Sequence, residues 1–70
     1  MENSRFIRRH TRGAFSFEQC VDDNTGVYSL TLYEHDKVCH ITHTSSELKA
    51  DELWWSGRSN CDDQALRGRW

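Results

Sequence analysis

The sequence contains no proline, so it has no rigid proline linker and no position at which proline would interrupt a β-ladder. It also lacks any apolar run long enough for a membrane span or for the core of a signal peptide, and residues 1–13 are polar and basic. We therefore expect a cytoplasmic protein that has no membrane partner.

Cysteine is scarce and widely spaced. Cys20, Cys39 and Cys61 are odd in number and include no close pair of the kind that structural zinc sites use. His40 and His43 would point to opposite faces of one strand, so they would not bind one ion together. These features predict reduced thiols, no metal site and no cofactor.

No catalytic motif is present. Cys39 precedes His40, but we expect the thiol to face the core and the imidazole to face away from it, out of each other's reach. Cys61 lies beside Asp62 and Asp63, whose negative charges would raise the pKa of its thiol and so weaken it as a nucleophile. The sequence predicts a protein that is not an enzyme.

What the chain does contain suits one small domain. Its 70 residues, 36% hydrophobic and 29% charged, fit a single folded unit over residues 1–70. Alternating apolar and polar residues predict strands over 13–21 and 27–33, joined by the turn sequence DDNTG. The next segment predicts a second hairpin with His35 and Asp36 at its tip.

Pairing these strands defines an expected core face. With Phe17 opposite Leu30 and Leu30 opposite Ile41, the apolar side chains of all three strands fall on one side of the sheet. The same register places Cys39 opposite Leu32 on that side. We therefore expect a three-stranded antiparallel meander.

A helical period follows the last strand. We expect a helix over residues 45–56, capped by Thr44 or Ser45, with Glu47 completing a capping box and Gly57 ending the helix. The remaining sequence predicts a second short helix, which would be capped by Ser59 or Asn60 and would end at Gly68. The predicted fold class is α+β: the meander packed on one helix, plus a short C-terminal helix.

Trp54 and Trp55 cannot both lie at the centre of one buried stripe, because neighbouring helical residues point about 100° apart. Trp54 falls with Ala50 and Leu53, so we assign it to the core. Trp55 shares the opposite side with Leu48. Either Trp55 meets a partner, or the terminal segments cover it through the side chains of Phe6, Ile7, Leu66 and Trp70.

Charge is segregated along the sequence. Residues 1–12 carry four arginines against one acid, whereas residues 14–66 carry ten acids against three bases. The basic segment fits a flexible arm, a turn of helix or an edge strand. The body is expected to be acidic, and an acidic surface attracts a basic one.

These features favour a small non-enzymatic protein-binding module, an inhibitor or regulator that occupies a basic surface, such as a nucleic-acid-binding one, on a larger protein or complex. Phage and mobile-element inhibitors of host defence, such as anti-CRISPR proteins, offer an analogy at the level of class. A homodimer through a strand edge or the Trp55 side is an open alternative. The expected partner-binding residues are Leu48, Asp51, Glu52, Trp55, Asp62 and Asp63.

The alternative function is a small DNA- or RNA-binding regulator. A basic arm can follow phosphates, and a sheet backed by a helix can enter a groove. A sheet that binds nucleic acid needs arginine and lysine on its exposed face. Here that face would instead offer residues such as Glu18 and Thr31. The residues that would carry this function are Arg5, Arg8, Arg9 and Arg12.

Overall fold

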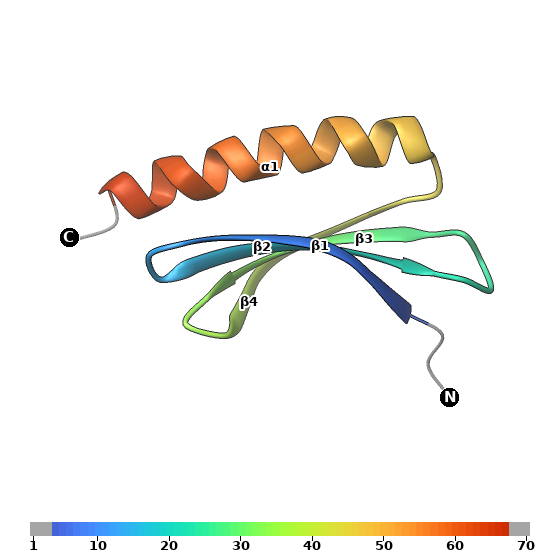
Figure 1. Ribbon diagram of the computed structural model, residues 1–70, viewed down its shortest axis with the longest axis horizontal. Coiled ribbons are helices and arrows are strands. Elements are labelled where there is room, and N and C mark those ends of the chain that lie inside the picture. Colours follow the sequence, from blue (N-terminus) through green and yellow to red (C-terminus); the bar gives the residue numbers. More distant parts are fainter. Residues whose placement is uncertain (1–3, 68–70) are drawn as a thin grey trace.

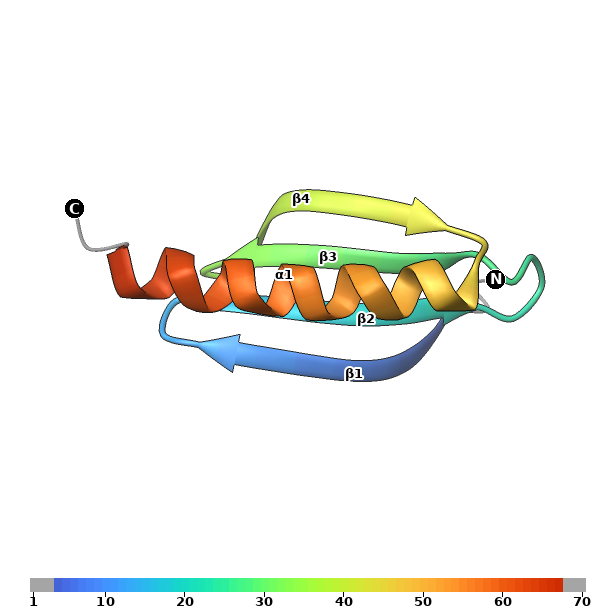
Figure 2. The same cartoon turned by 90° about the horizontal axis from the view of Figure 1, so that it is seen from above.

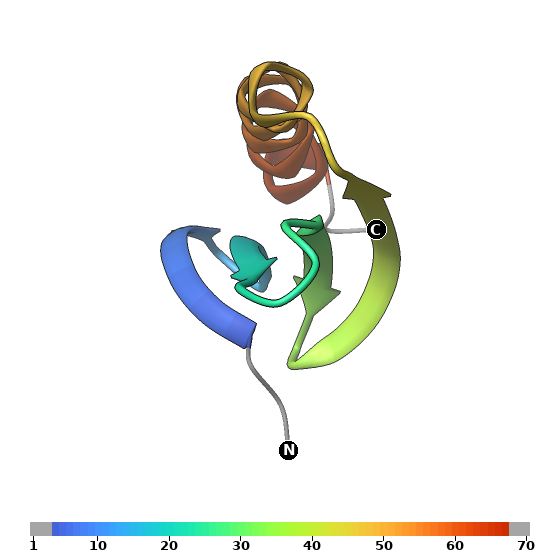
Figure 3. The same cartoon turned by 90° about the vertical axis from the view of Figure 1, so that its right-hand side faces the viewer.

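The computed structural model describes residues 4–67 and shows an α+β fold in two layers. Four strands form one antiparallel sheet in the order β1-β2-β3-β4, and a single helix lies along one face of it (Figure 1). Seen from above, the helix runs over the two central strands, with β1 and β4 on either side (Figure 2). The end-on view shows that the sheet is strongly twisted beneath the helix (Figure 3). The elements are β1 (Ser4–Arg12), β2 (Phe15–Asp22), β3 (Tyr28–Glu34), β4 (Lys37–Thr44) and α1 (Glu47–Arg67).

The N-terminal basic segment supplies the fourth strand, so the prediction of three strands was one too few. Of the three forms that the sequence left open for this segment, the structure shows the edge strand. Gly13, with a φ of 60°, sits in the tight turn that joins β1 to β2. A bulge between Phe6 and Arg8 interrupts the pairing of β1 with β2.

The hairpin of β2 and β3 confirms the predicted turn and the predicted core face, although the register differs by two residues. Phe17 lies opposite Leu32, and Gln19 lies opposite Leu30. The turn determines this register, since Asp22 N donates to Val27 O at 2.9 Å. A shift of two residues keeps every side chain on its face, so Phe15, Phe17, Gln19 and Val21 face the core as predicted. Ser16, expected on the solvent-exposed face, is also buried.

The turn between β3 and β4 is also as predicted, but the face of β4 is reversed. His35 and Asp36 form the tip with φ angles of 52° and 69°. A bulge then inserts Cys39 as an extra residue, and beyond it Thr31 lies opposite Ile41. The predicted core positions of Ile41 and Cys39 were therefore wrong, and both side chains are exposed.

The helix is continuous from Glu47 to Arg67, so the prediction of two helices separated at Gly57 was wrong. Ser46 caps it, since Lys49 N donates to Ser46 Oγ at 3.2 Å, so both predicted caps, Thr44 and Ser45, were too early in the sequence. Gly57 lies within the helix, where a Cβ atom would overlap the ring of Phe17. Gly68, the predicted end of the second helix, lies outside the described residues.

The core lies between α1 and the central strands. Trp54 is buried, as predicted, and its ring stacks on that of Phe17 with centroids 5.5 Å apart. Cys61 is fully buried and packs the C-terminal half of the helix on the sheet. The buried cluster consists of Phe15, Phe17, Leu30, Ala50, Trp54 and Cys61.

Candidate protein-interaction surface

Three large apolar side chains line up on the side of α1 that faces away from the sheet. Leu48 is 81% exposed, Trp55 is 53% exposed and Leu66 is 68% exposed. Their spacings of seven and eleven residues correspond to about two and three helical turns, so they share one face along about 27 Å of helix. We call Leu48, Trp55 and Leu66 the helix row.

Trp55 is 53% exposed, so the terminal segments within residues 4–67 leave about half of its side chain open to solvent. Phe6 pairs with Cys20 on the opposite face of the sheet, and Leu66 extends the row rather than covering it. Ile7 and Leu48 line a recess of about 500 Å³ between β1 and the first turns of α1, yet Leu48 remains largely exposed. Trp70 lies outside the described residues.

Two of the predicted contact acids are engaged within the fold. Asp51 Oδ1 lies 3.0 Å from Arg8 Nη2, and Asp62 Oδ1 lies 2.7 Å from His10 Nε2. The hydrogen bond with His10 lowers the pKa of Asp62 below its ordinary value of 3.8. Both carboxylates therefore help to hold α1 on β1.

The other two predicted acids, Glu52 and Asp63, are exposed on α1 and lie on the side of the helix row. Arg58 lies over the Trp55 ring, with its Cζ atom 5.3 Å from the ring centroid. The helix row is thus an apolar strip that Glu52 and Asp63 border on one side, with the guanidinium of Arg58 over Trp55 at its centre. Leu66 was missing from the prediction because an expected break at Gly57 separated it from Trp55.

The four arginines of the nucleic-acid alternative each have an acidic partner. Arg5 lies 3.1 Å from Asp23, Arg8 lies 3.0 Å from Asp51, Arg9 lies 3.9 Å from Glu18, and Arg12 lies 3.8 Å from Asp62, measured between side-chain nitrogen and oxygen. The charges that are segregated in the sequence are therefore interleaved in the fold.

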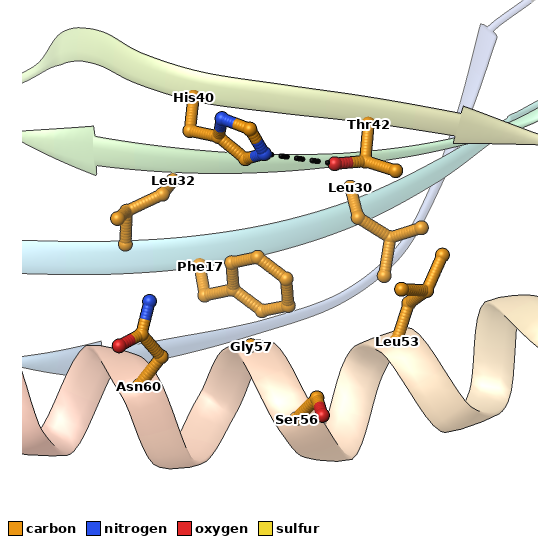
Figure 4. A pocket seen from close by; sticks show the side chains of 9 residues that line it. All are labelled: Phe17, Leu30, Leu32, His40, Thr42, Leu53, Ser56, Gly57 and Asn60. Carbon is orange, nitrogen blue, oxygen red and sulfur yellow. Dashed lines mark hydrogen bonds between the residues drawn. The ribbon is translucent and has the colours of Figure 1, made fainter.

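An open cleft separates α1 from β4, because the helix covers the central strands and leaves the edge strand bare (Figure 4). Its volume is about 330 Å³. His40 and Thr42 on β4 lie 3.1 Å apart between Nε2 and Oγ1 and form its polar side. The cleft was not predicted because Ile41 was expected on this face, where its side chain would have filled the space. The lining residues are Phe17, Leu30, Leu32, His40, Thr42, Leu53, Ser56, Gly57 and Asn60.

The thiols and imidazoles do not assemble into a reactive group within residues 4–67. His40 contacts Thr42, whereas Cys39 Sγ lies 3.9 Å from Glu34 Oε1. Burial raises the pKa of the Cys61 thiol, and the charge of Asp62 raises it further. In the same part of the chain, no three side chains of histidine, cysteine, aspartate or glutamate lie close enough to hold a metal ion. The three cysteines form no disulfide.

Comparisons of the chain with protein-family models, with curated proteins and with solved structures found no match. The single helix, as far as residues 4–67 describe it, is not apolar enough to cross a membrane.

Proposed function

We propose that this protein is a non-enzymatic binding module whose helix α1 docks into an apolar groove on a larger protein in the cytoplasm. The observation that carries the proposal is the helix row, Leu48, Trp55 and Leu66, all more than half exposed on one face. Helices that bind grooves present apolar anchors at such whole-turn spacings, and tryptophan is among the residues that contribute most to binding energy.

The scaffold supports this role because the opposite side of α1 is fully used in the fold. Ala50, Trp54 and Cys61 are buried against the sheet. A helix held in this way is ordered before it meets a partner, so binding does not have to supply the free energy of helix formation.

The charge around the helix row indicates the partner's chemistry. Glu52 and Asp63 border the row on one side, so the groove that receives it should have basic residues along the matching rim. Occupation of such a groove would exclude other ligands, and we therefore propose an inhibitor or regulator. A competitor for a nucleic-acid-binding surface, of the anti-defence type named above, is the specific form of this proposal.

The ion pairs favour this function over nucleic-acid binding through β1. Each arginine would have to exchange a carboxylate of its own fold for a phosphate, and Arg9 pairs with Glu18 on the sheet face opposite α1. A salt titration separates the two functions, because phosphate binding by four arginines would weaken steeply as salt rises.

The direct test is affinity capture from the native host with the tagged chain, followed by identification of the bound protein. We expect Trp55→Ala to remove the captured partner. Phe6→Ala is the matched control, since Phe6 is 58% exposed on the opposite face of the sheet. Equal capture by the wild-type chain and by Trp55→Ala would overturn the proposal.

A further inference from the structure

The two edges of the sheet differ in how they resist pairing with another strand. Both edge strands contain a bulge, but β1 also carries four arginines, which discourage the addition of a strand. β4 has no arginine, lysine, aspartate or glutamate, no proline and no glycine from Val38 to Thr44. A strand edge of this composition is a template for further β-pairing.

We propose that β4 pairs with β4 of a second copy of this chain. The two strands would run antiparallel about a two-fold axis at Ile41, giving one continuous eight-stranded sheet. Ile41 would face the partner's Ile41, and His40 would face the partner's Thr42. This surface is separate from the helix row, so the inference goes beyond the proposed function.

The absence of charged side chains from this part of β4 is the reason that we propose a second copy as its partner. Near a two-fold axis, residues meet identical residues or close neighbours of their own strand, so charged residues would meet like charges. The segment from Val38 to Thr44 avoids this repulsion, because its only titratable side chains are one thiol and two imidazoles. The same symmetry applied to β1 would bring Arg8 and Arg9 against their own copies.

Exposed apolar surface places the axis at Ile41. Ile41 is 48% exposed and Val38 is 59% exposed, although neither contributes to the core. In an antiparallel pair, directly opposite Cβ atoms lie about 4.5–5.5 Å apart, so the two Ile41 side chains would cover each other. The bulge at Cys39 ends just before His40, and the β3–β4 pairing is regular from His40 to Thr44 around this position.

Such a two-fold axis stands perpendicular to the sheet, so both helices would lie on the same face. Their helix rows would then point to the same side of the assembly. The cleft beside His40 and Thr42 would lie next to its copy across the axis.

Disulfide crosslinking tests the register. In a chain that carries Cys20→Ser and Cys39→Ser, we expect Ile41→Cys to form an intermolecular disulfide under mild oxidation. The matched control is His43→Cys in the same background, which is exposed on the same face. Its two copies would lie about 13 Å apart along the strands, too far for a disulfide. Restoring Cys39 to the control should restore crosslinking, because Cys39 would face the partner's residue 43.

Sedimentation of the unmodified chain tests the assembly itself. We expect a concentration-dependent dimer that Ile41→Lys converts to a monomer with an unchanged circular dichroism spectrum, because two lysines would meet at the axis. A monomer at every concentration would overturn the proposal. So would equal crosslinking of the Ile41→Cys and His43→Cys chains, or a dimer that survives Ile41→Lys and is lost in Trp55→Ala.

Discussion

Gly57 in the middle of α1 lies directly against the ring of Phe17 on β2, with no room between them for a Cβ atom. The ring has little freedom to move, because it is buried and stacked on Trp54. The absence of a side chain at position 57 therefore sets how closely the helix approaches the sheet.

Gly57→Ala should consequently destabilise the protein. On an open helix face the same change would stabilise by up to about 1 kcal/mol through helix propensity. Here the added methyl group overpacks the core, which typically costs about 1–3 kcal/mol, so we expect a net loss in the free energy of unfolding. Urea unfolding measures it, with Ser56→Ala, on an exposed neighbour, as the control.

The Gly57 variant has a second check in a double-mutant cycle. Phe17→Leu removes the ring that the new methyl group would meet, so Gly57→Ala should cost less in that background. Equal costs in the two backgrounds would mean that the ring is not the cause.

The guanidinium of Arg8, on β1, joins this strand to both β2 and α1. Its Cζ lies 4.5 Å from the centroid of Trp54, and its side chain also contacts Gln19 at 2.6 Å and Asp51 at 3.0 Å. Arg8→Ala should lower the free energy of unfolding by about 1–2 kcal/mol, the sum of a cation–π contact and a hydrogen bond.

Arg5→Ala is the matched control for the Arg8 experiment. Arg5 lies on the same strand as Arg8 and pairs with Asp23, but both side chains of this pair are mostly exposed. Exposed ion pairs contribute about 0–1 kcal/mol to stability. Chemical denaturation of both variants compares them. A larger loss for Arg5→Ala than for Arg8→Ala would contradict the assigned role of Arg8.

The two neighbours of β3 in the sheet, β2 and β4, differ in how far the sequence predicts which of their side chains face the core. The buried face of β2 was predictable despite a wrong register, because a strand repeats every two residues and the error was two residues. The face of β4 was not predictable, because one extra residue at Cys39 reverses it. Nothing in the local sequence distinguishes a bulge there from regular pairing.

The candidate interaction surface was also predictable only in part. The exposure of Trp55, which is 53%, was one of two alternatives that the sequence left open, whereas the burial of Trp54 was predicted. The inclusion of Leu66 was not, because Gly57 suggests a helix end unless one knows that Phe17 occupies the space beside it. Likewise, the pairing of Asp62 with His10 joins residues 52 positions apart, which local patterns do not specify.

The three cysteines should differ sharply in their reaction with an alkylating reagent. Cys39 is exposed and should react first. Burial raises the pKa of Cys20, and the charge of Glu18 adds to this, so its thiolate should be scarcer and its reaction slower. Cys61 is fully buried and should react only when the protein unfolds. Mass spectrometry of timed samples gives the order, and early labelling of Cys61 in the folded protein would contradict its position in the core.

Asp62 should make the stability of the fold sensitive to acid. The hydrogen bond with His10 lowers the pKa of Asp62 in the folded state, with smaller contributions from the charges of His10, Arg12 and Arg58. A carboxylate with a lowered folded pKa contributes stability that is present above its unfolded pKa of 3.8 and is lost as the pH falls through the folded value. The melting temperature of the wild-type chain should therefore decline in acid more steeply than that of Asp62→Asn, which has no carboxylate to protonate.

Glu52→Gln, on the solvent side of the same helix, should keep the wild-type profile because it leaves Asp62 intact. If Asp62→Asn and the wild-type chain decline in parallel from neutral pH into acid, the contact between His10 and Asp62 does not hold α1 on β1.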